Sequence, residues 1–434
     1  MVCFILSPAV KFYYFELLSL KMSEGIGRNE RAIHIGINYS GTESELNGCV
    51  SDAVNLLALS HRLGINDLIL GIDIDATDSE VMEEKTVKES RDILNGILSD
   101  VSLFRPTKNN VLNQIAATVE DDSIGSLFLT YSGHGASGWE SSANTEESDL
   151  TDEYICTLGN SGEYEGTYSS FISDDELFST INDASQNRSN PLVITYVFDC
   201  CHSGTVFDLP HSMRKINNKV EFTTQPSNKH SILNELVVMS GWSGCQDVQY
   251  SYENFNHENG MVEGVCTRGF LKAASDLNIE NTDNNLNHFD FTLLMSNHMF
   301  AIDDFEDSEV DTSNNYQVMN HSSSQNIGLV GDTRILIQKF VLGRANRLEL
   351  GDSDLTQLLE VSNYSELDIT DASPMDSSDE STADPTDDPT DDPTDPSDPS
   401  DPSDPSDPSD PSDPSDPYWN DDDHSTTRCK CIIL

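Results

Sequence analysis

Two glycine-rich stretches of the sequence carry residue types that could hydrolyse a peptide bond. The first reads Ser-Gly-His-Gly over 132–135, and the second reads Asp-Cys-Cys-His-Ser-Gly over 199–204. Cysteine hydrolysis needs a thiolate, a histidine that manages its proton, and N–H donors for the oxyanion. His134 and Cys201 can supply the first two, and the backbone N–H groups of Gly135 and Cys201 can supply the third. The sequence therefore predicts a cysteine-dependent site built from these residues.

The elements that must position these residues follow from the hydrophobic pattern. Short apolar runs predict buried strands, and apolar residues at helical spacing predict the helices between them. We expect strands over 32–38, 66–72, 126–133, 191–199 and 236–241, and helices over 52–64, 109–119 and 174–184, with an acidic insertion over 73–100 that has its own helix. Strands separated by helices indicate a mainly parallel sheet covered on both faces. Chemistry in such sheets lies past the carboxyl ends of the strands, where both glycine-rich stretches fall.

Six motifs, in order along the chain, resemble the metacaspases, which are caspase-fold cysteine peptidases. They read HIGINYSG, GCVSDA, LTYSGHG, ISDDEL, VFDCCHSGTVFDLP and SGWSGCQD, and the resemblance covers roughly residues 31–340. It implies an α/β fold, a caspase-like three-layer sandwich whose mainly parallel central sheet is flanked by helices. The short gap between FDLP and LVVMSG resembles the type I arrangement. By resemblance, His134 and Cys201 are the catalytic dyad, and the chain is a monomer.

The choice between the two adjacent cysteines rests on the family pattern. The nucleophile directly precedes His-Ser-Gly, which selects Cys201, and strand alternation would turn Cys200 the other way, into packing. Cys200 as the nucleophile stays an alternative, because a second thiol at this position departs from the family pattern. We expect His202, on the wrong side of Cys201, to be structural. Cys49 matches a family cysteine sometimes considered a second nucleophile, and we treat it as structural too.

Substrate specificity follows from acidic residues that the resemblance assigns to the S1 pocket. Asp52, Asp199 and Ser132 match residues that line this pocket in the family. Two carboxylates in a concave site favour a buried cation, so the residue before the scissile bond (P1) is expected to be Arg or Lys. The alternative for Asp52 is a structural role as the N-cap of the following helix. The chain's substrates are therefore expected to be polypeptides with a basic P1 residue.

Calcium is the expected cofactor, because hard cations prefer several carboxylate oxygens. By resemblance, the ligands are Asp152, Asp174, Asp175 and Asp208. The region 139–152 departs from the usual aspartate-rich and glycine-rich spacing, which leaves Asp152 the least secure of the four. The alternative for Asp174 and Asp175 is a helix N-terminus, where negative charge is favoured by the helix dipole.

Five regions are expected along the chain. They are an N-terminal extension (1–30), a large catalytic region (31–210), a basic linker loop (211–235), a small region (236–345), and a disordered Asp/Ser/Pro-rich tail (346–434). If the enzyme cuts after Arg or Lys, the linker loop is a natural site of self-cleavage. The candidate residues are Arg214, Lys215 and Lys219. The extension reflects either a start at Met22 or an added helix rather than a signal peptide, since charges interrupt its apolar core.

The composition of the chain excludes some classes of binding partner. The 434-residue chain has a formal net charge of −53, which repels nucleic acid and anionic lipid. Nine scattered cysteines indicate reduced cytosolic thiols rather than a disulfide framework. No run of 18 uncharged apolar residues is present, so no membrane span is expected.

The tail contains a repeat of Asp-Pro-Thr and then Ser-Asp-Pro from Asp384 to Pro417. Proline nearly every third residue excludes helix and central strand and favours an extended polyproline II spacer. The last four residues, CIIL, form a prenylation signal on Cys431, and Cys429 would be the second lipid anchor. We expect a cytoplasmic protein anchored on the cytosolic face of a membrane.

Three hypotheses of function remain. The leading one is a calcium-activated cysteine endopeptidase with Arg/Lys specificity, possible self-processing and a membrane tether. The second is a catalytically idle caspase-fold interaction module at a membrane, and the third is another acyl-transfer enzyme on this fold, such as a ligase. The intact set of His134, Cys201, Asp52 and Asp199 favours the first.

Overall fold

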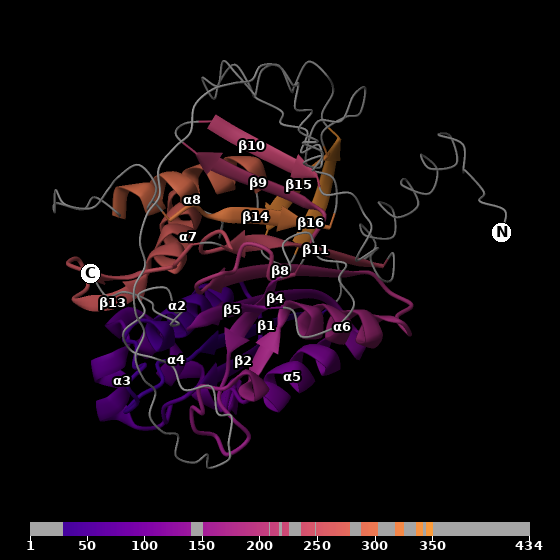
Figure 1. Ribbon diagram of the computed structural model, residues 1–434. Coiled ribbons are helices and arrows are strands. Elements are labelled where there is room, and N and C mark those ends of the chain that lie inside the picture. Colours follow the sequence, from indigo (N-terminus) through magenta and orange to yellow (C-terminus); the bar gives the residue numbers. More distant parts are fainter. Residues whose placement is uncertain are drawn as a thin grey trace, which may run out of the picture. The chain divides into compact units, whose positions relative to one another are not determined.

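A nine-stranded sheet forms the centre of the computed structural model (Figure 1). The structure describes residues 29–139, 151–207, 209–216, 219–224, 236–247, 249–277, 288–302, 317–324, 336–341 and 344–349. The strand order is β10-β9-β14-β11-β8-β4-β1-β2-β3. The strands are β1 (Asn29–Gly36), β2 (Asp67–Ile72), β3 (Val101–Phe104), β4 (Ile124–Ser132), β8 (Leu192–Asp199), β9 (His211–Ile216), β10 (Lys219–Thr224), β11 (Val237–Ser243) and β14 (Asn320–Ser323).

Six neighbouring strands, from β3 to β11, are parallel, which confirms the predicted parallel core. β14, β9 and β10 complete one edge in antiparallel pairs, so the whole sheet is mixed. The inner parallel strands β2, β4, β8 and β11 are almost fully buried, as expected for strands covered on both faces, whereas the edge strand β3 is mostly exposed. On β4, Leu129 and Tyr131 face one apolar cluster and Phe128 faces the other.

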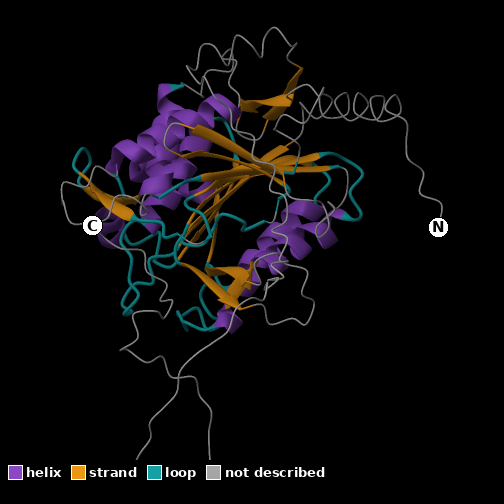
Figure 2. Cartoon of the chain, turned by 45° about the horizontal axis from the view of Figure 1, so that its top comes forward, coloured by secondary structure: helices purple, strands orange, loops and turns teal. Residues whose placement is uncertain are grey.

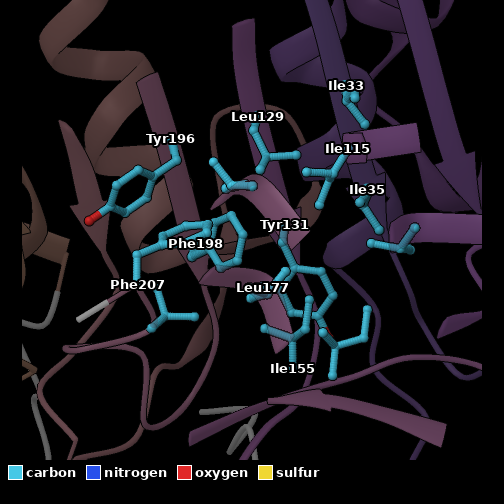
Figure 3. Close-up of a cluster of buried hydrophobic side chains, with 14 of the residues drawn as sticks. Ile33, Ile35, Ile115, Leu129, Tyr131, Ile155, Leu177, Tyr196, Phe198 and Phe207 are labelled. Carbon is cyan, nitrogen blue, oxygen red and sulfur yellow. The ribbon is translucent and has the colours of Figure 1, made fainter. Parts of the chain in front are cut away.

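Helices cover both faces of the sheet, and the two faces can be followed in Figure 2. The helices are α2 (Cys49–Arg62), α3 (Ser79–Lys85), α4 (Lys88–Ile97), α5 (Lys108–Glu120), α6 (Asp174–Ser185), α7 (Val265–Asp276) and α8 (His288–Ile302), with 3-10 turns η1 (Leu98–Asp100) and η2 (Tyr168–Ser170). α5 and α6 pack on one face, where Ile115 and Leu177 join the cluster drawn in Figure 3. α2, α4, α7 and α8 pack on the other. This arrangement is the predicted three-layer sandwich.

Three small sheets lie outside the central one. β5 (Gly135–Trp139), β6 (Thr151–Cys156) and β7 (Phe171–Ser173) form an antiparallel sheet directly after the His134 turn. β12 (Glu253–Asn256) pairs with β13 (Met261–Gly264), and β15 (Leu336–Val341) pairs with β16 (Arg344–Glu349). Local signals explain where some helices begin. Ser173 and Glu176 form a reciprocal capping box that starts α6 at Asp174.

The predicted basic loop differs from what the structure shows. β9 (211–216) and β10 (219–224) pair in antiparallel orientation as the β9–β10 hairpin at the sheet edge, because Met213 and Val220 alternate with polar residues and bury one face. The described part of the chain contains no helix long and apolar enough to cross a membrane. The predicted lipid anchors, Cys429 and Cys431, and almost all of the tail lie outside the described residues.

Packing of α2 against β1 gives the first test. A Cβ on Gly36 would collide with the carbonyl oxygen of Cys49 and lie 2.8 Å from Ala53 Cβ. We expect Gly36→Ala to lower the free energy of unfolding by about 1–3 kcal/mol, because backbone must shift. The matched control is Gly96→Ala in α4, where nothing lies within 4 Å and a gain of up to ~1 kcal/mol is expected. Denaturant unfolding of both variants measures this, and equal losses would contradict it.

Candidate active site

The two glycine-rich stretches meet because their strands are neighbours. β4 and β8 pair in parallel with Ser132 opposite Asp199, and the Gly133 N–H donates to the Asp199 carbonyl oxygen at 3.3 Å. His134 and Cys201 each stand two residues beyond this pair. The sheet register therefore brings the predicted dyad to the same edge.

Gly135 and Cys201, the predicted oxyanion pair, lie with their backbones in contact. A Cβ on Gly135 would collide with the Cys201 carbonyl oxygen and lie 3.1 Å from the Cys201 nitrogen. Only glycine allows this approach. The histidine turn and the cysteine turn are thus locked side by side through main chain.

The His134 ring is held in one tautomer. Its Nε2 lies 2.8 Å from the Ser44 carbonyl oxygen, which can only accept, so Nε2 carries the proton. Nδ1 is buried and has no hydrogen-bond partner among the described residues. Burial lowers the pKa of His134 to about 4, against the opposing effect of the Ser44 bond. At neutral pH the ring is therefore uncharged, with a lone pair on Nδ1 available to take a proton.

Tyr39 holds the histidine turn, and sequence reasoning did not single it out. Its hydroxyl accepts the His134 N–H at 2.8 Å and donates to the Cys156 carbonyl at 2.7 Å, while its ring packs on the imidazole with centroids 4.6 Å apart. Tyr131 adds a second hydroxyl, which donates to the His134 carbonyl at 2.8 Å. Tyr39 has φ of +53°, an unusual conformation for a non-glycine residue. The motif HIGINYSG contains it, but no spacing rule marks its role.

The two adjacent cysteines have different surroundings. Cys200 belongs to the apolar cluster on the α5 and α6 face, and Cys201 does not. The Cys201 sulfur lies 3.7 Å from the Ser251 carbonyl oxygen. His202 has φ of +54° and its Nδ1 contacts the Asp247 carbonyl oxygen. The arrangement leaves Cys201 as the cysteine that lies against the histidine turn.

Both dyad side chains are covered in this structure. Cys201 is 0% exposed and His134 is 2% exposed. The segment that carries Ser251 lies against the cysteine turn, where the His202 N–H donates to the Gln249 carbonyl at 3.2 Å. A peptide can reach the sulfur only after this covering chain moves.

The predicted S1 residues form a buried acidic site beside the dyad. Ser132 donates to Asp52 at 2.7 Å, and Ser251 donates to Asp199 at 2.6 Å. Gly264 separates the two carboxylates. A Cβ there would collide with Asp199 Oδ2 and lie 2.7 Å from Asp52 Oδ2. The structure thus brings Asp52, Asp199 and Ser132 together.

Asp52 is not the N-cap of α2, which corrects the structural alternative for this residue. Gly48 is the N-cap, and Asp52 stands inside the first turn with its carboxylate accepting the Gly264 N–H at 3.1 and 3.2 Å. In the first turn the Asn38 side chain accepts the Val50 N–H at 3.0 Å, and Glu253, far away in sequence, binds the residues just before the helix. Glu253 accepts the N–H groups of Gly48 at 2.6 Å and Asn47 at 3.2 Å.

The acidic site repels its own charges. Burial raises the pKa of Asp52 well above its usual range, and the Asp199 carboxylate adds to the rise. Burial likewise raises the pKa of Asp199, although Ser251 and the Thr267 backbone N–H oppose it. Two further buried acids, Glu253 and Glu263, lie near enough to raise the pKa of Asp52. A cation entering this site would relieve the repulsion.

Glu263 has partners of its own, which sequence reasoning also missed. Its carboxylate accepts from the side chains of Asn256 at 2.7 Å and Asn259 at 2.9 Å, and Arg268 lies 3.9 Å away.

Cys49 donates to Glu253 at 3.5 Å, and burial raises the pKa of the Cys49 thiol well above normal. Such a thiol stays protonated, which supports the structural role predicted for Cys49.

The predicted calcium ligands gather where β6 meets β7. Asp152 and Asp174 are buried and Asp175 is exposed, whereas Asp208 lies outside the described residues. Asp152 Oδ2 accepts from Tyr154 at 2.9 Å, but its buried Oδ1 has no hydrogen-bond partner among the described residues. Such an orphaned carboxylate oxygen is what a bound cation would satisfy, so the residues fit calcium.

The calcium geometry is nevertheless incomplete. No group of three or more acidic, His or Cys side chains within the described ranges is arranged to hold a metal ion. Glu153, next to Asp152, is bonded to Thr205 at 3.0 Å, and its N–H lies 3.5 Å from Asp174 Oδ2. Glu153 therefore connects the predicted calcium ligands to Thr205, in the segment that follows Cys201. Sequence reasoning did not find this connection.

The candidate self-cleavage residues lie on the two outermost strands at one edge of the sheet, β9 and β10. Arg214 pairs with Glu221 at 2.9 Å across the β9–β10 hairpin, and Lys215 contacts Asn297 of α8. Lys219 begins β10, and its side chain is outside the described set. Cleavage at any of them requires the hairpin to open, because a peptidase binds its substrate as an extended, unpaired strand.

Comparison with known proteins agrees with this geometry. Residues 30–210 match the family model described as "Metacaspase, peptidase C14 domain". The chain is 27% identical to Metacaspase-2 of Trypanosoma brucei brucei over 256 residues, which cover 57% of this chain and 62% of that protein. It is 30% identical to Metacaspase-1 of Plasmodium falciparum (52% and 31% covered) and 31% identical to Metacaspase-1 of Saccharomyces cerevisiae (44% and 37% covered).

The chain thus spans about three fifths, or less, of the length of the curated relatives it matches. The matched residues 30–210 contain the dyad, Asp52, Asp199 and the carboxylates at β6 and β7. Through this region, the chain is similar to the metacaspase family of cysteine peptidases.

Proposed function

We propose that this protein is a calcium-activated cysteine endopeptidase that cleaves polypeptides after Arg or Lys. The observation that carries the proposal is the main-chain contact that joins the His134 turn to the Cys201 turn, with a buried pair of carboxylates beside them. The dyad would carry out catalysis and the carboxylates would bind the substrate, and a single substitution can test each role.

The catalytic step follows from the His134 tautomer. Because Nε2–H is bonded to Ser44, the lone pair on Nδ1 can accept the Cys201 thiol proton. The thiolate then attacks the substrate carbonyl carbon, and its oxygen takes the negative charge. The backbone N–H groups of Gly135 and Cys201 are the proposed donors to that oxyanion. Protonated His134 returns its proton to the leaving amine, and water hydrolyses the thioester.

Specificity rests on the charge of the S1 residues. Asp52 and Asp199 are buried side by side, so a guanidinium or ammonium group entering there would be attracted more strongly than in water and would lower their raised pKa values. An Asp at P1, which would add a third negative charge to this pair, is disfavoured by repulsion. Basic P1 residues are therefore the proposed substrates.

Calcium is the proposed activator. Asp152, Asp174 and Asp175 would hold the ion, together with Asp208. The bound ion supplies positive charge that offsets the carboxylates. Glu153 and Thr205 connect this group to the turn after Cys201, so ordering of the carboxylates can reach the nucleophile's own turn.

Self-processing would occur in the β9–β10 hairpin, at Arg214, Lys215 or Lys219. β10 is the edge strand of the sheet, and edge pairing is the easiest to open. Lys215 also contacts Asn297 of α8, so cleavage at Lys215 would require this contact to break as well.

The dyad gives the first functional test. Peptide substrates ending in Arg, Lys or Asp before a fluorogenic leaving group separate the hypotheses directly. We expect Cys201→Ala and His134→Ala to lower kcat/KM for Arg and Lys peptides by at least ~100-fold. Cys200→Ala, the matched control, should keep activity near wild type, because its side chain packs into the apolar cluster. Loss of activity in Cys200→Ala but not in Cys201→Ala would reverse the assignment. No cleavage by folded wild type would favour the idle interaction module.

The S1 carboxylates give a test that joins activity and stability. Since the pKa of Asp52 is raised in the native state, the folded protein binds that proton more tightly than the unfolded chain. Folding stability is therefore lost as pH rises above the usual Asp pKa, roughly 4. We expect Asp52→Asn to be more stable than wild type at pH 7, with the gain disappearing near pH 4 and below. The same variant should lose ~100-fold in kcat/KM for Arg peptides.

Asp73→Asn is the matched control for this experiment. Asp73 is also buried, but its carboxylate accepts the N–H groups of Asn38 at 3.0 Å and Ser40 at 3.2 Å, away from the S1 site. It should lose stability and keep the preference for basic P1 residues. Thermal unfolding from pH 4 to 8, with peptide cleavage at pH 7, measures both. A destabilised Asp52→Asn with unchanged specificity would contradict the S1 assignment.

Calcium binding is tested without reference to activity. Titration calorimetry on the full chain carrying Cys201→Ala measures the affinity for Ca²⁺ directly. We expect Asp152→Asn in that background to weaken binding by about 10-fold or more, because one charged ligand is lost. Asp183→Asn is the control, since Asp183 is an exposed carboxylate elsewhere on α6. Equal affinity in both variants would remove Asp152 from the site.

A further inference from the structure

The chain around the nucleophile holds more thiols than the proposed peptidase reaction uses. Cys200, Cys201, Cys245 and Cys266 are all buried, and none of the four is in a disulfide. Cys245 is distinguished by its position. It stands just past the end of β11, the strand that pairs with β8 on the side away from β4.

The register of β8 and β11 places Cys245 beside the cysteine turn. The strands are parallel with Phe198 opposite Ser243, and the Gly244 N–H donates to the Phe198 carbonyl at 2.7 Å. Counting on two residues from this pair brings Cys245 level with Cys200. Neighbouring strands are about 4.8 Å apart, so the turn that carries Cys245 runs directly beside the turn that carries Cys200 and Cys201.

Side-chain contacts show where the Cys245 sulfur lies. It is 3.4 Å from the carbonyl oxygen of Cys200, which belongs to the peptide bond that leads into Cys201. It is also 3.3 Å from the Gln249 carbonyl, two residues before the Ser251 carbonyl that the Cys201 sulfur contacts. Cys245 therefore lies inside the turn that carries the nucleophile.

We propose that Cys245 is a resolving thiol, which captures oxidised Cys201 in a reversible disulfide. The proposal rests on Cys201 being the reactive thiol of the proposed peptidase. The thiolate that attacks peptides is also the form that hydroperoxides oxidise. A catalytic cysteine is therefore susceptible to irreversible oxidation to sulfinic or sulfonic acid. A nearby second thiol gives the damage a reversible end point.

The chemistry requires a hydroperoxide, with hydrogen peroxide as the simplest case. The Cys201 thiolate attacks one peroxide oxygen, the O–O bond breaks, and Cys201 sulfenic acid and hydroxide form. The Cys245 thiol then attacks the Cys201 sulfur, so that the S–S bond forms and the S–O bond breaks. The Cys245 proton leaves with the hydroxyl group as water. Two thiols have been oxidised and one peroxide reduced.

Cys245 is suited to the second step rather than the first. Burial raises the pKa of its thiol well above normal, and the nearby Cys201 sulfur adds to that rise. It therefore stays protonated and inert until a sulfenic acid appears beside it. Cys200 is the poorer partner, because its side chain packs in the apolar cluster and a disulfide between adjacent residues must close a strained ring.

The test treats the calcium-free full chain with hydrogen peroxide and maps the products by mass spectrometry. Wild type should lose ~2 Da, and digestion without reductant should yield a Cys201–Cys245 linked peptide. Cys200→Ser is the matched control and should form the same link. Cys245→Ser should instead gain ~32 or ~48 Da at Cys201, as sulfinic or sulfonic acid.

Activity gives the second readout. Dithiothreitol should restore cleavage of Arg peptides to oxidised wild type and oxidised Cys200→Ser, but to less than a tenth in oxidised Cys245→Ser. Mapping a Cys200–Cys201 link, or over-oxidation of Cys201 in wild type, overturns the proposal. The wild-type map needs no variant to fold. A correct Cys201–Cys245 link in a protein that cleaves no peptide would refute the proposed function and leave this inference standing.

Discussion

The parallel pairing of β4 with β8 is the constraint on which the rest of the site depends. It puts Ser132 opposite Asp199, so that the turns beyond them must run side by side. One turn then carries the imidazole of His134 and the other carries the thiol of Cys201. The paired residues themselves, Ser132 and Asp199, form part of the acidic site. The nucleophile, base and specificity residues are thus fixed by one register. A slip of that register would separate all of them together, because every side chain of a strand changes face when its pairing shifts by one residue.

The acidic site lowers the stability of the fold, because it buries two carboxylates side by side. Buried carboxylates are costly unless they are paired, and here Asp52 and Asp199 are satisfied mainly by hydroxyl and backbone donors. These donors hold the side chains in place but do not cancel their charge. The missing positive charge is left for a ligand to supply. Energy stored as repulsion in the free protein becomes binding energy when a cation enters.

Much of the fold could be predicted because its central strands are long, apolar and buried on both faces. β1, β4, β8 and β11 fall where the pattern placed them, and so do α5 and α6. The β9–β10 hairpin was wrongly expected to be a loop. Its charged residues dominate the local composition, while the burial of Met213 and Val220 depends on β14, which arrives about a hundred residues later.

The site divides along similar lines. The dyad and the S1 aspartates are found from motifs, since each stands at a strand end or in a helix that the pattern reveals. Glu253 and Glu263 are invisible to such reasoning, because they act on α2 from more than 200 residues away. Tyr39 was missed for a different reason. Its role depends on a positive φ and on two backbone groups from other segments, the His134 N–H and the Cys156 carbonyl.

The proposed S1 site also bears on the order in which the parts of this region can assemble during synthesis. The dyad and both aspartates are complete by residue 201, yet the groups that close the site are Ser251, Glu253, Gly264 and Thr267. A nascent chain that has emerged only as far as the nucleophile lacks the groups that surround its carboxylates and lacks the Glu253 contacts just before α2. Competence therefore arrives with the β12–β13 hairpin and α7, not with Cys201. The proposed catalytic residues are therefore translated well before the residues that complete the buried acidic site.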